Sequence, residues 1–120
     1  MVNEKVCKKL IEVAKKQGKY KDGIITYSDL NIDCNLGIAF EGDAGGKEIG
    51  EILGDISKRE YKNNRPLLSV VVVLKGAHPP ITASGFFELW EELGLRKKGE
   101  SREIFFAKEL ARVHDYWSKH

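Results

Sequence analysis

The apolar run LLSVVVVL at residues 67–74 constrains the fold of this chain more than any other feature. Apolar residues at nearly every position, instead of every second one, indicate a segment buried on both faces, and β-branched side chains favour extended backbone. Only Ser69 interrupts the run. We therefore expect a central strand at residues 67–74, with residues 24–25, 36–40 or 80–83 as its neighbours in a small sheet.

Helical patterns occupy most of the remaining chain. Apolar residues recur at helical spacing, and capping residues such as Thr26 and Ser101 mark helix starts. Thr26 begins a short helix, residues 35–46 form a glycine-rich loop, and longer helices are expected at about residues 3–17, 47–63, 84–93 and 101–117. The sequence thus predicts a single α+β domain spanning residues 1–120, with about five helices around a small sheet.

The composition is that of a globular domain. Of 120 residues, 42% are hydrophobic and 32% are charged, and no apolar run approaches the ~20 residues needed to cross a bilayer. The first residues, MVNEKVCKKL, carry charges where a secretion signal is apolar. The cysteines, Cys7 and Cys34, are too few for a disulfide framework. We expect a cytoplasmic protein with no membrane partner.

No pattern of catalytic or metal-binding residues stands out. His78, His114 and His120 lie far apart in the sequence, without a cysteine or carboxylate at ligand spacing beside them. Glycines precede Lys47, but the phosphate-binding pattern GxxxxGK[ST] is absent. The sequence therefore predicts no catalytic residue, no metal and no cofactor, and it favours a binding module over an enzyme.

Charge is segregated along the chain, although the net charge is only +2. Residues 1–22 hold seven lysines against three acids, and residues 58–75 hold five basic residues against one acid. Residues 23–57 are acidic, with one lysine against seven acids. Such blocks can form a basic face that meets phosphate, and solvated helix surfaces produce the same pattern.

A glycine strip marks the predicted helix at residues 47–63. Gly46, Gly50 and Gly54 are four residues apart and fall along one side of that helix. Each interior glycine costs about 1 kcal/mol relative to alanine. We expect something to approach this strip closely, with neighbouring backbone favoured over a ligand.

The order of elements from Ile24 to Phe87 resembles the winged-helix DNA-binding domain of the alkyltransferase-like proteins, relatives of alkylguanine-DNA alkyltransferase. Three segments carry most of the resemblance. ITYSDL at residues 25–30 is similar to the family's "TYG" helix start, GKEIGEIL at 46–53 to its recognition helix, and RPLLSVVV at 65–72 to the strand after it. GFF at residues 85–87 matches a later glycine of the family. The resemblance covers about half of the chain and implies a winged-helix-like fold that docks DNA through its second helix.

This chain departs from the family at the reacting group. The Pro-Cys-His-Arg alkyl-acceptor motif is missing, with Ser69 and Val70 in that region, which excludes alkyl transfer. The recognition helix would also expose Glu48, Glu51 and Asp55, which is unfavourable beside phosphate. The whole sequence is also similar to small uncharacterised bacterial and phage proteins that share an "RPLLS…GFFEL…W" pattern, which implies no activity.

Two functions follow as hypotheses. The first is a non-enzymatic module that binds nucleic acid through basic surface clusters. The alternative is an accessory protein that binds another protein or a small nucleotide, for example in conflict between phage and host. A surplus of aromatic residues near the C-terminus fits either burial in the monomer or a homodimer seam. The predicted nucleic-acid-binding residues are Tyr27, Lys47, Lys58, Arg59, Lys62, Arg65, Lys97 and Lys98.

Overall fold

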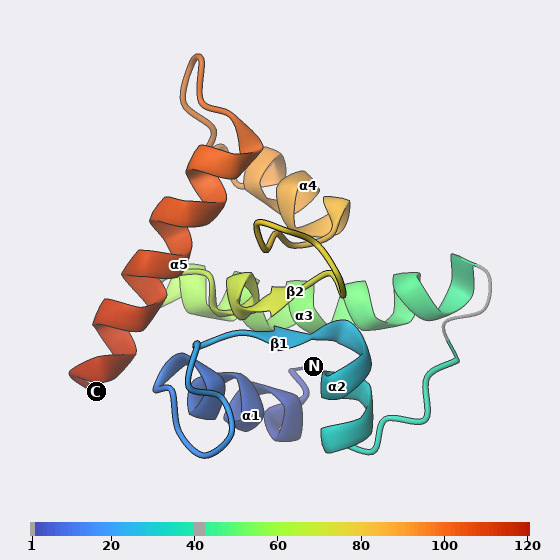
Figure 1. The fold of residues 1–120 in the computed structure, drawn as a ribbon. Coiled ribbons are helices and arrows are strands. Elements are labelled where there is room, and N and C mark those ends of the chain that lie inside the picture. The colour runs from blue at the N-terminus through green and yellow to red at the C-terminus, as the bar shows by residue number, and fades with distance from the viewer. Residues whose placement is uncertain (1, 40–42) are drawn as a thin grey trace.

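The computed structural model describes residues 2–39 and 43–120. Its elements are, in chain order, α1 (Glu4–Ala14), β1 (Ile25–Thr26), α2 (Tyr27–Asp33), α3 (Asp43–Lys62), the 3₁₀ helix η1 (Leu68–Val71), β2 (Val72–Val73), α4 (Ser84–Glu92) and α5 (Arg102–Ser118) (Figure 1). The strands β1 and β2 form a two-stranded parallel sheet, in which Ile25 pairs with Val72 and Thr26 with Val73. The α+β class and the five helices are confirmed.

The predicted strand at residues 67–74 is wrong over most of its length. Residues 68–71 form η1, and only residues 72–73 are extended in the sheet. Burial itself is confirmed, because Leu67 to Val73 are all buried. The physical reason is that α1, α3 and α5 all pack against η1. The run is therefore enclosed by helices instead of lying between two neighbouring strands of a sheet. An apolar run reports enclosure and does not by itself fix the backbone conformation.

Side chains replace the missing strand partners of this segment. The Leu67 N–H donates to Oε2 of Glu109 at 2.7 Å, and the Ser69 N–H donates to the Ser57 hydroxyl at 3.1 Å. The two serine hydroxyls also bond one another at 2.6 Å. Buried backbone groups must be hydrogen-bonded, and here two buried polar side chains, those of Glu109 and Ser57, meet that need.

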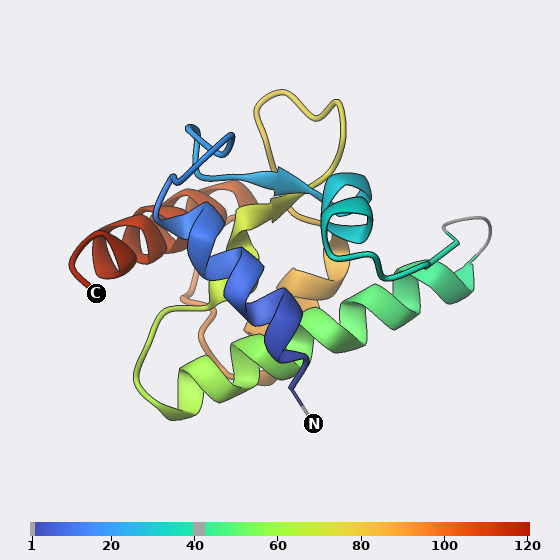
Figure 2. The ribbon, with the colours of Figure 1, turned by 90° about the horizontal axis from the view of Figure 1, so that it is seen from below.

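The neighbours of the run are partly those expected. Ile25 pairs with Val72, and the Leu74 N–H donates to the Ile81 carbonyl at 2.9 Å after the intervening loop. Residues 36–39 form no strand, and the rest of that candidate segment lies outside the described residues. Figure 2 shows the loop after β2 projecting from the body of the molecule.

Capping residues begin three of the helices where the sequence places them. Asn3 accepts the Val6 N–H at 3.1 Å, Thr26 the Asp29 N–H at 3.1 Å, and Ser101 the Ile104 N–H at 3.2 Å. Each bond satisfies an amide that the first turn of a helix leaves unpaired. Helix α1 ends at Ala14 instead of residue 17, and α3 begins at residue 43 instead of 47, inside the predicted loop.

Most of the aromatic residues of α5 are accounted for within the monomer. Phe105 and Phe106 are each 7% exposed, and the ring of Phe105 stacks on Trp90 of α4 with 4.6 Å between centroids. Trp117 packs against the edge of the core. None of the helices in the described ranges is long and apolar enough to traverse a membrane.

Candidate functional site

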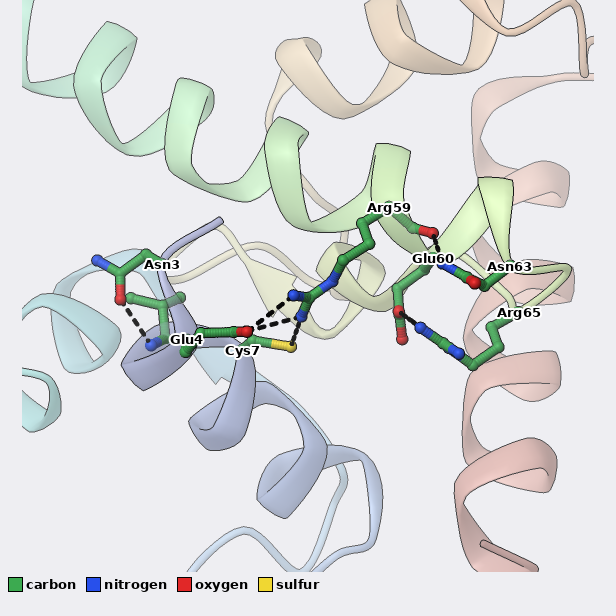
Figure 3. A network of polar contacts seen from close by, with 8 residues as sticks. Asn3, Glu4, Cys7, Arg59, Glu60, Asn63 and Arg65 are labelled. Carbon is green, nitrogen blue, oxygen red and sulfur yellow. Dashed lines mark hydrogen bonds and ion pairs between the residues drawn. The ribbon is translucent and has the colours of Figure 1, made fainter. Parts of the chain in front are cut away.

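The arginine at the centre of the predicted basic cluster is held by a carboxylate of α1. Both terminal nitrogens of Arg59 donate to Glu4, at 2.9 and 2.8 Å, and Nη2 also contacts Sγ of Cys7 at 3.2 Å (Figure 3). This hydrogen bond lowers the pKa of the Glu4 carboxyl from its usual value. The paired geometry matches the two nitrogens to the two oxygens. Arg59 therefore joins α3 to α1, and most of its donors are occupied.

The second arginine of the cluster neutralises a buried acid. Nε and Nη2 of Arg65 donate to Oε2 of Glu60 at 3.0 and 2.6 Å, beside the Arg59 pair in Figure 3. The Glu60 side chain is 2% exposed, and an unpaired carboxylate at that depth would cost several kcal/mol. The Glu60 hydrogen bond in turn raises the pKa of Arg65.

The other predicted nucleic-acid residues divide into engaged and exposed groups. The hydroxyl of Tyr27 accepts the Ala83 N–H at 3.0 Å between α2 and α4, and burial raises its pKa. Nζ of Lys58 lies 3.6 Å from Glu92, in an exposed pair that contributes little. Four of the predicted lysines are exposed and form no ion pair among the described residues, namely Lys47, Lys62, Lys97 and Lys98.

The close approach expected at the glycine strip is not found among the described residues. A Cβ built on Gly46, Gly50 or Gly54 would meet no heavy atom within 4 Å. The reason is the orientation of α3, which turns Gly46 and Gly50 toward solvent and leaves Gly54 at the edge of the packed face. The glycine that does require close approach is Gly23, which the sequence did not single out.

A groove of about 850 Å³ lies between α5 and the loop that follows β2. One wall is a face of α5, where residues spaced three and four apart align. The other wall is the loop at residues 77–81, and residues 22–24 close one end. The lining residues are Asp22, Ile24, Ala77, His78, Pro79, Pro80, Ile81, Glu103, Phe106, Ala107, Leu110, Ala111 and His114.

Small side chains keep the α5 wall open. Ala107 and Ala111 are exposed one turn apart, above the partly buried Leu110 and the buried Phe106. The opposite wall contains Pro79 and Pro80, so it has two residues without an N–H to donate. The result is a depression with an apolar floor and few polar groups on its sides.

A histidine and a glycine fix the closed end of the groove. Nε2 of His114 bonds the Gly23 carbonyl at 2.9 Å. Gly23 has φ +72°, and a Cβ there would lie 2.2 Å from the same nitrogen. Only glycine fits this position without displacing the imidazole, so the contact sets the distance between α5 and the segment before β1.

The charged residues of the groove are acidic. Asp22 and Glu103 are exposed among its lining residues, and the lining contains neither lysine nor arginine. It also contains no serine, threonine or cysteine that could act as a nucleophile. In the described part of the chain, no group of three or more His, Cys, Asp and Glu side chains could hold a metal ion. The arrangement suits binding more than covalent chemistry.

The groove residues were not among the sites predicted from the sequence. The alignment of Ala107 and Ala111 with Leu110 on one helix face was a visible signal of a shallow apolar strip. The opposing wall comes from segments far apart in the chain, which no local pattern relates to α5. Comparison with family models, with curated proteins and with solved structures gave no match for this chain.

Proposed function

We propose that this chain is a non-enzymatic binding module whose groove holds an apolar segment of a partner protein. The observation that carries the proposal is the apolar groove of about 850 Å³ beside exposed Ala107 and Ala111. A concave, mostly apolar surface with a few polar groups is the usual form of a binding site. The two alanines leave room for a partner backbone to lie close to α5.

Charge complementarity defines the partner segment. Asp22 and Glu103 are the acidic side chains of the groove, and its lining residues include no lysine or arginine. A segment with apolar side chains for the floor and lysine or arginine near its ends would satisfy both features. Complementary charge at a rim raises the association rate and disfavours acidic competitors.

The test is titration with two short leucine-and-alanine peptides, one with lysines at both ends and one with glutamates. The lysine peptide is expected to bind, and the D22K/E103K double variant is expected to weaken it about tenfold. E51K/D55K, at two exposed α3 positions outside the groove, makes the same change in net charge and is the matched control. Equal binding of both peptides, or no binding of either, would reject the proposal.

Nucleic-acid binding is the second candidate, supported by four predicted lysines that are exposed and form no ion pair among the described residues, Lys47, Lys62, Lys97 and Lys98. It keeps the winged-helix interpretation as a proposal, supported by the order β1, α2, α3, although the segment matched to the family's next strand is mostly the 3₁₀ helix η1. Duplex DNA, single-stranded DNA and RNA, each measured at two salt concentrations, test this candidate. The informative variant is K62E/K97E/K98E, since Arg59 and Arg65 are needed to pair Glu4 and Glu60.

A further inference from the structure

A second pocket, of about 320 Å³, lies where the C-terminal end of α3 meets the middle of α5. Its lining includes Tyr61 from the last turn of α3, Asn64 just after that helix, and the two arginines Arg65 and Arg112. The nucleic-acid-binding residues predicted from the sequence include Arg65 and omit Arg112. The fold brings these two guanidinium groups, 47 positions apart in the sequence, to one pocket.

Each guanidinium is fixed by a carboxylate buried behind it. Arg65 uses Nε and Nη2 on Glu60, and Arg112 uses Nη1 on Oε1 of Glu109 at 2.6 Å. The side chains of Glu60 and Glu109 are 2% and 3% exposed, whereas those of Arg65 and Arg112 are 28% and 63% exposed. The negative charge is thus inside the protein and the positive charge is toward solvent.

Donors remain on both arginines. Nη1 of Arg65, and Nε and Nη2 of Arg112, have no hydrogen-bond partner among the described residues. Both oxygens of the Glu109 carboxylate are engaged, because Oε1 accepts from Arg112 and Oε2 accepts the Leu67 N–H. Guanidinium donors held in a fixed orientation are well suited to phosphate oxygens, which accept two parallel N–H bonds.

The rest of the pocket suits the group attached to a phosphate. Tyr61 is 41% exposed and lines the pocket, and aromatic rings stack on nucleobases. Asn64 adds an exposed amide beside Arg65. The charges, donors and ring together fit a nucleotide better than an isolated inorganic anion.

We infer that this pocket binds a phosphate group through Arg65 and Arg112, as part of a nucleotide stacked on Tyr61. This site is separate from the groove and does not depend on the function proposed for it. The same phosphate chemistry has a second source, the backbone of a nucleic acid, and the experiment distinguishes the two.

The test is an NMR titration of the full chain with AMP, with adenosine as the ligand that lacks only the phosphate, and with inorganic phosphate. AMP is expected to shift the NMR signals of the backbone amides around Tyr61, Arg65 and Arg112, whereas adenosine is expected to leave them unchanged. Arg112→Gln should weaken AMP about tenfold or more, whereas Lys108→Gln, which removes the same charge from α5 outside the pocket, should not. Equal shifts with adenosine and AMP, or no shift with any phosphate, would overturn the proposal.

Two further arms keep the result interpretable. Arg112→Gln leaves the buried Glu109 carboxylate without its ion-pair partner. The double variant E109Q/R112Q therefore serves as the version without a buried unpaired charge. Tyr61→Leu should weaken the binding of AMP but leave the binding of inorganic phosphate unchanged. A third result is that AMP does not bind, whereas duplex DNA binds to wild type and not to Arg112→Gln. In that case the phosphate comes from a nucleic-acid backbone, and the nucleotide assignment is overturned.

Discussion

The buried carboxylate of Glu109 accepts the backbone N–H of Leu67 across 2.7 Å, joining α5 to the residue before η1. Glu109 is 2% exposed and its other oxygen pairs with Arg112. A carboxylate in the core serves here as a backbone partner, in the place that a neighbouring strand would otherwise take. This bond is one reason why an apolar run typical of strands can fold as a 3₁₀ helix.

Glu109→Ala should therefore destabilise the fold strongly. It leaves the Leu67 N–H without a partner inside the core and creates a cavity, with an expected loss of about 3 kcal/mol in the free energy of unfolding. Glu109→Gln keeps an acceptor oxygen and should cost less than Glu109→Ala. Urea denaturation measures both, with Glu103→Ala on the exposed face of the same helix expected to fall within about 0.5 kcal/mol of wild type. Equal stability of wild type and Glu109→Ala would show that the bond is not needed.

Gly23→Ala should be destabilising because its new methyl group would collide with the imidazole of His114. The backbone at Gly23 has φ +72°, which also disfavours alanine. We expect a loss of more than about 1 kcal/mol in unfolding free energy, measured by thermal or urea denaturation. His114→Ala in the same background should recover part of the loss, since it removes the clash. No recovery would assign the effect to backbone strain alone.

Gly50→Ala, in contrast to Gly23→Ala, should stabilise the fold. The position is helical and exposed, and a Cβ there has no heavy atom within 4 Å. Alanine should raise the free energy of unfolding by about 0.5–1 kcal/mol, because it restricts the unfolded chain and favours the helix. Denaturation curves measured beside Gly23→Ala compare the two glycines directly. A destabilised Gly50→Ala variant would indicate that something does approach the strip.

These two glycines also show what the sequence can and cannot predict. Composition, caps and helical spacing predicted the α+β class, the five helices and the starts at Thr26 and Ser101, because these depend on local chemistry. The strip at Gly46, Gly50 and Gly54 and the strand at 67–74 required knowledge of what packs opposite each segment. The groove and the pairing of Arg65 with Arg112 at one pocket depend on tertiary contacts alone, so no local pattern indicated them.

The ion pair between Arg59 and Glu4 predicts a stability contribution that depends on pH. The hydrogen bond from Arg59 lowers the pKa of Glu4 in the folded protein below its ordinary value of 4.5. Because the pKa of Glu4 is lower in the folded than in the unfolded protein, the ion pair stabilises the fold at pH values above the unfolded-state pKa. This contribution is lost as the pH falls through the folded-state pKa. Glu4→Gln should therefore be less stable than wild type at neutral pH, and the two should converge in acid. Denaturation at several pH values tests this, and a difference that persists in strong acid would contradict it.

Binding at the groove is the central claim, and the measurement that tests it most directly is NMR mapping of the lysine-ended peptide on wild type and on Ala111→Phe. The phenylalanine would fill the groove at an exposed position of α5, and Ser118→Phe places the same ring on that helix outside the groove. We predict shifts concentrated at residues 22–24, 77–81 and 103–114 in wild type, retained in Ser118→Phe and abolished in Ala111→Phe. Shifts located elsewhere, or undiminished by Ala111→Phe, would contradict the claim.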